Sequence, residues 1–456
     1  MKKIALIYTS VSLTDDFSTG KSHEEVMPPL WALALATYLR AALPSVKLDI
    51  IDEQLLGREG LRKKLALARY DLAGFSPVAH TYKRVLDCAR QVKKNGAMVV
   101  MGGHYAPTLA KEILANRGPG SPDHCVDAIV RYDGENALYE LARGTSFKNI
   151  KNLVYPGPGG KIIENLVEIL DMARLPPVDY TLVKLADYFR RQLPPAHSCL
   201  TLPFAAQRGC RLAQGAGRCA FCSIQSSGGV RALPPEAAAL QISFLARKFG
   251  VGYVYESSDD FVSDPDWLKQ YASAAGLERP VLHVHASASL LNPGNISLLK
   301  AVNAQFVNMG IESMSAAVLR ALGKGSTVAG NRRAILRLME AGLTPNVNLI
   351  LGLSGETRET LSETFSELKK LKLPAGACRR ISLPTLAVFP GTGVWRRLLA
   401  KEPKYHGQDM LNYEESFRDW LKHFCGVSEA DVMSAKVAIE DFFVARRKLL
   451  ERSGQG

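Results

Sequence analysis

The stretch that decides the fold of this chain is Gln207-Arg208-Gly209-Cys210-Arg211-Leu212-Ala213-Gln214-Gly215-Ala216-Gly217-Arg218-Cys219-Ala220-Phe221-Cys222-Ser223-Ile224-Gln225. It places three cysteines, Cys210, Cys219 and Cys222, in one short loop after the apolar segment Cys199–Ala206. Three thiolates suit an iron–sulfur cluster with one open iron, much as a catalytic zinc keeps an open position. A zinc site closed by Cys199 and a chance grouping are the alternatives.

The length and composition describe a globular chain. At 456 residues, of which 47% are hydrophobic, it can hold two or three domains with cores of their own. Eight cysteines are too few for a disulfide scaffold in a chain of this length. The first apolar run, Ile4–Tyr8, predicts a strand rather than a signal peptide, and no run approaches the ~18 apolar residues that span a bilayer. We therefore expect a cytoplasmic protein without a membrane span.

The net charge of +13 does not by itself indicate a nucleic-acid-binding surface. Lysines and arginines are spread along the chain, and the longest unbroken basic runs are the triplets Arg62-Lys63-Lys64 and Arg446-Arg447-Lys448. A nucleic-acid-binding surface concentrates such residues on one face or helix. The pattern favours a generally basic surface.

Strand and helix patterns alternate through residues 1–145. The expected strands are Lys3–Tyr8, Val46–Ile51, Asp71–Phe75, Ala97–Met101 and Val126–Arg131, and the expected helices are Leu30–Leu43, His80–Lys94 and Glu135–Ala142. This alternation predicts an α/β domain with a doubly wound, Rossmann-like parallel sheet. Such sheets bind ligands beyond the carboxyl ends of their strands.

Those strand ends carry residues suited to a bulky ligand. They read Gly74-Phe75-Ser76-Pro77, Gly102-Gly103-His104-Tyr105 and Asp133-Gly134-Glu135, and glycine lets a backbone approach a ligand closely. In this order they resemble the cobalamin-binding domain that precedes many radical S-adenosylmethionine (SAM) cores. The resemblance implies cobalamin contacts at Ser76, Gly102, Gly103, His104 and Glu135. The chain departs from the family where His104 follows Gly103 without a spacer and where the last turn begins Tyr132-Asp133.

One absent motif sharpens this expectation. The chain has no Asp-x-His-x-x-Gly, by which other cobalamin proteins supply a histidine to cobalt. The resemblance then implies cobalamin held without a protein imidazole, its lower face meeting Pro77–Thr81. His80 lies in that loop, where a role at a helix start is favoured.

The rest of the chain predicts a linker, a barrel and a tail. Residues 146–198 are rich in proline and glycine and are expected to be a linker. From 199 to 395 six strand candidates alternate with helices, which predicts a partial (β/α)6 barrel with its chemistry at the carboxyl-end mouth. The candidates are Cys199–Ala206, Tyr253–Glu256, Val281–Ser287, Phe306–Gly310, Asn346–Leu351 and Arg380–Ala387. Residues 396–456 are expected to be helical, at Tyr413–Phe424 and Ser428–Leu450.

The cysteine loop resembles the cluster loop of radical SAM enzymes, whose pattern is Cys-x3-Cys-x2-Cys. Phe221 matches the aromatic before the last cysteine, and Arg208-Gly209 matches the common entry to the first. The first gap is eight residues rather than three, and loops tolerate such insertions at modest entropic cost. The resemblance implies that Cys210, Cys219 and Cys222 bind a [4Fe–4S] cluster.

Further strand ends match the same family in order. Asp259 and Asp260 stand where the family holds the methionine amine of SAM, Glu312 stands in the ribose segment, and Gly352 stands on the adenine-side strand. Taken singly, Asp260 and Glu312 have a plainer interpretation as solvated loop charges. Four ordered matches behind a matching first domain favour the cluster over zinc.

The resemblance implies a cobalamin-dependent radical SAM enzyme. It would use a 5′-deoxyadenosyl radical and methylcobalamin to methylate an unactivated carbon of a small-molecule substrate, with an electron donor such as flavodoxin or ferredoxin. A radical rearrangement or cyclisation without methyl transfer is one alternative. A non-catalytic cobalamin- or metal-binding protein, marked by the altered cysteine spacing, is the other.

Overall fold

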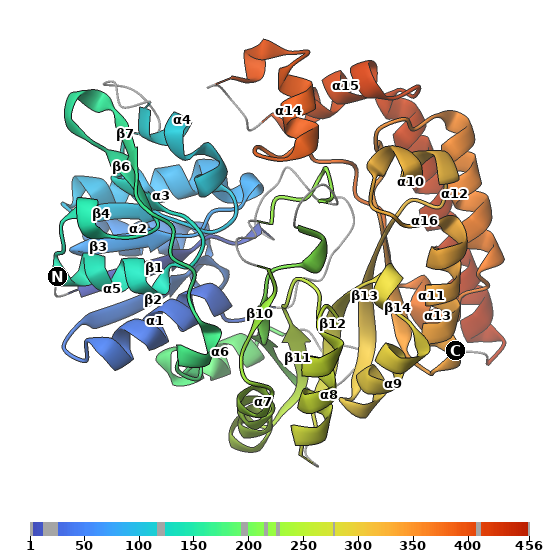
Figure 1. Cartoon of the computed structure of the whole chain (residues 1–456), viewed down its shortest axis with the longest axis horizontal. Helices are drawn as coiled ribbons and strands as arrows, with labels where there is room; N and C mark the ends of the chain where they lie inside the picture. The colour runs from blue at the N-terminus through green and yellow to red at the C-terminus, as the bar shows by residue number, and fades with distance from the viewer. Residues whose placement is uncertain are drawn as a thin grey trace. The chain divides into compact units, whose positions relative to one another are not determined.

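The computed structural model describes residues 3–11, 26–115, 124–192, 199–213, 218–224, 229–276, 279–406 and 412–454. The chain forms two compact units, Met1–Pro203 and Phe204–Gly456. Each is described by itself (Figure 1).

The first unit contains a seven-stranded sheet in the order β2-β1-β3-β4-β5-β6-β7. Its strands are β1 (Lys3–Tyr8), β2 (Lys47–Asp52), β3 (Leu72–Phe75), β4 (Met98–Met101), β5 (Ala128–Val130), β6 (Leu153–Pro156) and β7 (Ile162–Glu164). The pairings among β1 to β5 are parallel. The strand order 2-1-3-4-5 changes direction between β1 and β3, and the ligand crevice of such sheets lies at that point, beyond the carboxyl ends.

Helices cover both faces of this sheet. They are α1 (Leu30–Ala42), α2 (Glu53–Leu67), α3 (Tyr82–Lys94), α4 (Ala110–Ala115) and α5 (Glu135–Arg143). α1 and α5 pack on one face through a core that includes Leu6, Leu39, Val100 and Leu138, and α2 and α3 lie on the other (Figure 1). The predicted doubly wound fold is confirmed.

Residues 146–198 hold more structure than a linker. β6 pairs with β5 and β7 pairs with β6, both antiparallel, and they extend the sheet past residue 145. The proline- and glycine-rich run at 156–160 is the turn of this hairpin, with Gly159 and Gly160 at positive φ. Strands of three and four residues are too short for their periodicity to stand out beside such a turn.

A second sheet has six strands in chain order, β8-β11-β12-β13-β14-β15. They are β8 (Leu200–Phe204), β11 (Val251–Glu256), β12 (Val281–Ser287), β13 (Ala304–Glu312), β14 (Thr344–Leu349) and β15 (Ile381–Ser382). The pairings from β11 to β15 are parallel. The helices between them include α7 (Pro235–Phe249), α8 (Pro265–Ala274), α9 (Pro293–Ala301), α10 (Ala316–Leu322), α11 (Val328–Glu340), α12 (Arg358–Lys370) and α13 (Ala375–Cys378). The predicted half-barrel is confirmed.

The C-terminal part is helical, as the sequence predicts. It holds α14 (Gly393–Leu399), α15 (Tyr413–Phe424) and α16 (Glu429–Arg452). α16 lies along α12 and α13 (Figure 1). Among the described residues, no helix combines the length and apolarity that a membrane span requires.

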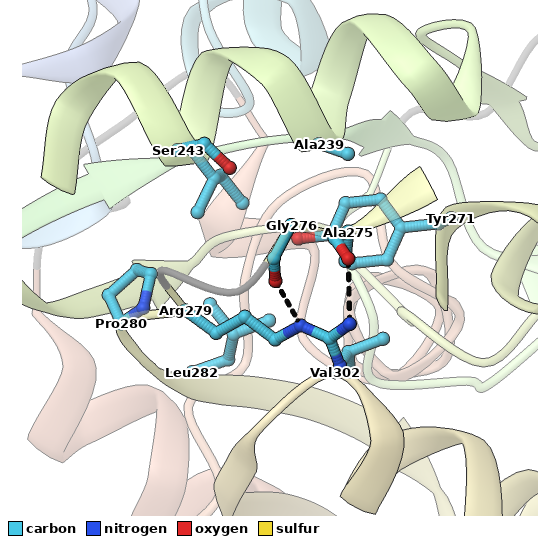
Figure 2. Close-up of a pocket in the computed structure, with 10 residues that line it drawn as sticks. Ala239, Ser243, Tyr271, Ala275, Gly276, Arg279, Pro280, Leu282 and Val302 are labelled. Carbon is cyan, nitrogen blue, oxygen red and sulfur yellow. Dashed lines mark hydrogen bonds between the residues drawn. The ribbon is translucent and has the colours of Figure 1, made fainter. Parts of the chain in front are cut away.

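A small cavity lies at the amino end of the half-barrel, between α7, α8 and the start of β12 (Figure 2). Arg279 borders it and donates hydrogen bonds to the backbone oxygens of Gly276 at 2.5 Å and Ala275 at 2.6 Å. Chemistry in barrel folds sits at the opposite, carboxyl end, and conserved features of the amino end serve stability. We therefore assign this cavity no part in the candidate site.

Candidate active site

The cysteine loop leaves β8 through a tight turn at Gly209. Gln207–Arg208 forms the short strand β9, which pairs antiparallel with β10 (Arg231–Ala232). Gly209 has φ of 96°, and a Cβ there would lie 2.4 Å from the backbone oxygen of Gly229. Only glycine fits this conformation and this space. The glycine before Cys210 is therefore required by the fold.

Three side chains at the end of β11 hold the backbone that leads to Cys210. Glu256 accepts the N–H of Ala206 at 2.7 Å, Ser258 Oγ accepts that of Gln207 at 2.8 Å, and Asp259 accepts that of Gly209 at 2.8 Å. Glu256 is fully buried and also accepts from the hydroxyl of Ser258 at 2.7 Å. Hydrogen bonds to a charged acceptor contribute more than neutral ones. The Glu256–Asp259 segment thus positions the entry of the cysteine loop.

The three cysteines are free thiols and are partly buried. Burial raises the pKa of the Cys210 thiol to about 11, with further contributions from Asp260, Cys222 and Asp259. Burial also raises the pKa of Cys219 and of Cys222, and the charge of Glu312 adds to both shifts. Because the thiolate is the ligand form, these thiols need a bound cation to ionise at neutral pH. The shifts place Asp259, Asp260 and Glu312 within electrostatic reach of the loop.

Cys199 does not join this loop. It precedes the first residue of β8, whereas Cys210 follows the last, and five strand residues span about 16 Å. Within the described ranges, no group of three or more His, Cys, Asp or Glu side chains is gathered to hold a single metal ion. Three free thiols in an anchored loop fit the donor set of an iron–sulfur cluster. Gln214–Gly217, between the first two cysteines, lie outside the described residues.

The predicted pair Asp259 and Asp260 is split by the structure. Asp260 is 1% exposed, and its carboxylate accepts the Ser287 hydroxyl at 2.6 Å. Burial raises its pKa. It therefore ties the end of β11 to the end of β12 and is not a solvated loop charge, while its predicted contact with the SAM amine stays a prediction. Asp259 is partly exposed.

Glu312 forms a buried ion pair that the sequence did not indicate. Its Oε1 lies 2.6 Å from Lys324 Nζ, and each side chain is 7% exposed. Lys324 also donates to the backbone oxygen of Gly310 at 2.7 Å. Glu312 sits at the end of β13 with φ of 62°, a strained conformation for a residue other than glycine. The signal that could have found Lys324 is the run Gly323-Lys324-Gly325, whose glycines both have positive φ.

Gly352 lies against α15. A Cβ there would lie 2.4 Å from the ring of Phe417 in α15. Its carbonyl accepts from Trp420 Nε1 at 2.9 Å, and its N–H donates to the carboxylate of Glu356. Its φ of 83° favours glycine. Gly352 therefore has a packing role against α15, and its predicted contact with a cofactor stays a prediction.

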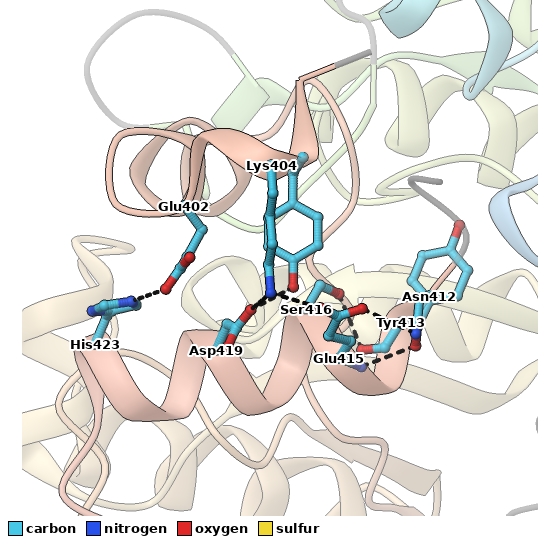
Figure 3. Close-up of polar contacts among 9 residues, drawn as sticks. Glu402, Lys404, Asn412, Tyr413, Glu415, Ser416, Asp419 and His423 are labelled. Carbon is cyan, nitrogen blue, oxygen red and sulfur yellow. Dashed lines mark hydrogen bonds and ion pairs between the residues drawn. The ribbon is translucent and has the colours of Figure 1, made fainter. Parts of the chain in front are cut away.

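The helix that covers Gly352 is braced by the segment after α14 (Figure 3). Lys404 contacts Glu415 at 2.6 Å and Asp419 at 2.7 Å, and the Tyr405 hydroxyl donates to Asp419 at 2.7 Å. His423 contacts Glu402 at 2.6 Å. These contacts hold α15 against residues 402–405.

In the first unit, the ends of β3 and β4 meet as the sequence predicts. A Cβ on Gly103 would lie 2.3 Å from Ser76 Oγ, and the Gly102 N–H donates to the backbone oxygen of Phe75 at 2.9 Å. Gly103 and His104 are exposed, and Ser76 and Gly102 are partly exposed. Four of the predicted residues therefore form an accessible edge beside the crevice. That edge fits a ligand that lies against backbone.

Glu135 does not belong to that edge. It is 2% exposed at the start of α5, and its charge contributes, after burial, to the raised pKa of Tyr38 in α1. α1 and α5 pack together. Its side chain is enclosed by its own domain, and the predicted contact of Glu135 with a cofactor stays a prediction.

The comparison with sequence families agrees with the cysteine loop. The family described as the radical SAM superfamily matches residues 206–368. The "Anaerobic magnesium-protoporphyrin IX monomethyl ester cyclase" of Rubrivivax gelatinosus is 25% identical over 362 residues, 74% of this chain and 61% of the relative. The "Uncharacterized methyltransferase PH0819" of Pyrococcus horikoshii is 26% identical over 396 residues, 82% of this chain and 79% of the relative. The match thus spans less than two thirds of the cyclase.

Two solved structures share the fold over most of the chain. The cobalamin-dependent SAM radical enzyme OxsB, with aqua-cobalamin and SAM bound, has a TM-score of 0.72 at 15% identity, covering 99% of this chain and 72% of that one. The radical SAM methyltransferase TsrM from Kitasatospora setae has a TM-score of 0.66 at 16% identity, covering 88% and 79%. Residues 206–368 therefore match the radical SAM superfamily, and the chain shares its fold with solved cobalamin-dependent radical SAM enzymes.

Proposed function

We propose that this chain is a cobalamin-dependent radical SAM enzyme that methylates an unactivated carbon of a small-molecule substrate. The observation that carries the proposal is the loop of three free thiols, anchored by Glu256, Ser258 and Asp259 at the carboxyl ends of the half-barrel strands. We assign cobalamin to residues 1–145, the cluster and SAM to residues 199–395, and a covering role to residues 396–456.

The chain's own residues would bind and orient the cofactors. Cys210, Cys219 and Cys222 would hold a [4Fe–4S] cluster, Asp259 would meet the SAM amine, and Glu312 with Lys324 would meet the ribose. Ser76, Gly102, Gly103 and His104 would line the cobalamin edge. The bound cofactors supply the radical and the methyl carrier, while the protein supplies orientation and exclusion of water. An electron donor such as flavodoxin or ferredoxin would supply the reducing electron.

Three similar proteins support different outcomes for the substrate. The names of TsrM and of the Pyrococcus protein include methyltransferase, which favours methylation. The Rubrivivax relative is named a cyclase, which favours a radical cyclisation without methyl transfer as the second candidate. A non-catalytic binder is the alternative from another class.

Reductive SAM cleavage separates enzyme from binder. The full chain, reconstituted anaerobically with iron, sulfide and cobalamin, should release 5′-deoxyadenosine from SAM in the presence of dithionite or reduced flavodoxin. SAM carrying a deuterated methyl group, incubated with extract of a strain that lacks the protein, should give a labelled product. Cleavage with an unlabelled, dehydrogenated or cyclised product would instead support the cyclase-like reaction. No cleavage by a fully loaded protein would contradict both enzyme proposals.

A further inference from the structure

The inner face of the half-barrel in the second unit is polar. Alternate residues on neighbouring strands β11 to β14 face one another there, namely Tyr253, Tyr255, His283, His285, Phe306, Asn308 and Asn346. Barrel interiors are ordinarily filled by branched apolar residues. A buried polar network costs stability wherever a member lacks a partner. Such an interior is therefore unusual for packing alone.

These side chains form two layers. The deep layer is buried, with Tyr253 4% exposed, His283 8%, Phe306 6% and Asn346 8%. The upper layer, Tyr255, His285 and Asn308, lies nearer the carboxyl ends of the strands and is partly exposed. The upper layer is thus the part of the network that a ligand in the half-barrel can reach.

The deep layer fixes the orientation of the upper one. The Tyr253 hydroxyl lies 2.8 Å from His283 Nδ1, and Asn346 Nδ2 lies 2.9 Å from His283 Nε2. Because an amide nitrogen only donates, His283 Nε2 accepts and the ring proton sits on Nδ1. Asn346 Nδ2 also donates to Asn308 Oδ1 at 2.6 Å. The amide nitrogen of Asn308 is thereby turned toward the upper layer.

Asn308 makes only long hydrogen bonds to the other two residues of the upper layer. The Tyr255 hydroxyl lies 2.9 Å from His285 Nε2. Asn308 Nδ2 lies 3.4 Å from each of these two atoms, which is beyond the usual hydrogen-bond range. Below it, Asn346 Oδ1 is buried without a hydrogen-bond partner among the described residues. A polar group of a ligand could accept one short hydrogen bond from Asn308 Nδ2, which would replace its two long contacts with Tyr255 and His285.

The charges around this layer favour a neutral ligand. Burial lowers the pKa of His283 to about 4 and also lowers that of His285, so both rings are neutral at pH 7. The guanidinium of Arg380 lies over the ring of Phe306, 3.9 Å from its centroid, in the deep layer. Asp259 lies within electrostatic reach of His285. An anionic group placed on the upper layer would meet this carboxylate and no charged imidazole.

We infer that Tyr255, His285 and Asn308 bind a neutral polar group of the substrate that both donates and accepts hydrogen bonds, such as a carboxamide, a hydroxyl or a ring nitrogen. This rests on the proposed function, because these residues would orient the substrate of that reaction below the cysteine loop. These three are positioning residues. The part of the substrate that contacts them would be neutral and polar, rather than a carboxylate or a phosphate.

A pair of probes that differ mainly in charge tests this inference. The full chain, reconstituted with its cluster, is titrated with nicotinamide and with nicotinate, and binding is followed by saturation-transfer NMR. Nicotinamide should bind at least fivefold more tightly than nicotinate. Tyr255→Phe and Asn308→Leu should each weaken nicotinamide binding by roughly fivefold, the effect of one neutral hydrogen bond, and should reduce the preference over nicotinate.

The matched control is Tyr271→Phe. Tyr271 belongs to α8, outside the half-barrel interior, where it stacks on Trp267. This variant should leave both affinities unchanged. Failure of nicotinamide to bind, a preference for nicotinate, or unchanged affinity in both network variants overturns the inference. The titration needs no SAM cleavage. A protein that cleaves no SAM but still prefers nicotinamide to nicotinate would therefore contradict the proposed function and support this binding site.

Discussion

Asp259 accepts a hydrogen bond from the backbone N–H of Gly209 at 2.8 Å, one residue before the first cysteine of the loop. The bond joins the end of β11 to the turn that leaves β8. No larger residue can replace Gly209, because the backbone of Gly229 fills the position that a Cβ would take. The position of Cys210 therefore depends on a carboxylate 49 residues further along the chain.

Asp259→Ala should impair cluster assembly. Loss of a charge-assisted hydrogen bond costs about 1.5–3 kcal/mol, and part of that cost would fall on the geometry of the cysteine loop. We expect several-fold less iron per chain after anaerobic reconstitution, with Asp259→Asn retaining much of the iron because its amide oxygen can still accept. The exposed Asp266, in the first turn of α8, supplies the control Asp266→Ala. Full iron content in Asp259→Ala would show that the loop is held without this bond.

Cys210, Cys219 and Cys222 should be required for the cluster, and Cys199 should not. Alanine at all three loop positions should remove about four irons per chain, the content of one cubane cluster, together with its visible absorbance. Cys199→Ala should retain both, because Cys199 lies at the other end of β8. Iron and absorbance measured on the two variants distinguish an open cluster from a four-thiolate zinc site. Loss of the metal in Cys199→Ala would overturn the open site.

Glu312 and Lys324 should be strongly coupled in stability and in SAM binding. Removing one partner of a buried ion pair leaves the other charge uncompensated, at about 3–5 kcal/mol. Glu312→Gln and Lys324→Met should each lower the urea midpoint of the second unit, and the double variant should lose much less than the sum. SAM binding by Glu312→Gln should weaken roughly tenfold with the cluster intact. Additive stability losses would mean that the ion pair does not form in solution.

The buried carboxyl of Glu356 should make stability fall as pH rises. Burial raises its pKa from 4.5 to about 7 in the folded chain. The folded state therefore favours the protonated form, and the stabilisation is complete below pH 4.5 and is lost as pH rises through 7. Glu356→Gln removes this titration. The urea midpoint of the variant should therefore rise relative to that of the wild type as the pH increases from 5 to 8. The corresponding change in the free energy of unfolding is on the order of 3 kcal/mol.

Tryptophan fluorescence follows this unfolding, because Trp420 donates to Gly352 beside Glu356. Glu363→Gln, in the helix α12 that follows Glu356, serves as the control. A midpoint difference that does not change with pH would contradict the raised pKa of Glu356.

The doubly wound sheet, the half-barrel and the cysteine loop could be predicted from the sequence because they rest on local patterns. Strand periodicity, the glycine before Cys210 and the strand-end glycines are each set by a few neighbouring residues. Ser76 and Gly103 were correctly expected on one edge, since the carboxyl ends of parallel strands meet there.

The sequence does not show an environment that a distant segment sets. Gly352 packs against Phe417, Asp260 accepts a hydrogen bond from Ser287, and Glu312 pairs with Lys324. None of these partners is adjacent in sequence. The polar interior was within reach of sequence reasoning. Tyr253-x-Tyr255, His283-x-His285 and Asn346-x-Asn348 place polar residues at alternate positions on successive strands.

Cobalamin binding in the first unit is best tested at Gly102. A large side chain at Gly103 would disturb Ser76 whether or not a ligand binds, since its Cβ would lie 2.3 Å from Ser76 Oγ. At Gly102 a Cβ would meet its nearest atom, the Val130 oxygen, at an ordinary 3.5 Å. Gly102→Val should therefore fold and yet exclude a ligand that lies against this edge. We expect the full wild-type chain to retain cobalamin through desalting and Gly102→Val to lose it.

The spectrum of the bound cobalamin tests the lower face. Because no Asp-x-His-x-x-Gly motif is present, cobalt should lack imidazole coordination, and His80→Ala and His104→Ala should leave the spectrum unchanged. Gly60→Val, in α2 on the outside of the unit, is the matched glycine control and should retain cobalamin. A change of spectrum in His80→Ala would identify that imidazole as a cobalt ligand. If the wild-type chain retains no cobalamin, methyl transfer through cobalt is excluded, because the exposed edge at Gly102 and Gly103 would then serve only as a turn.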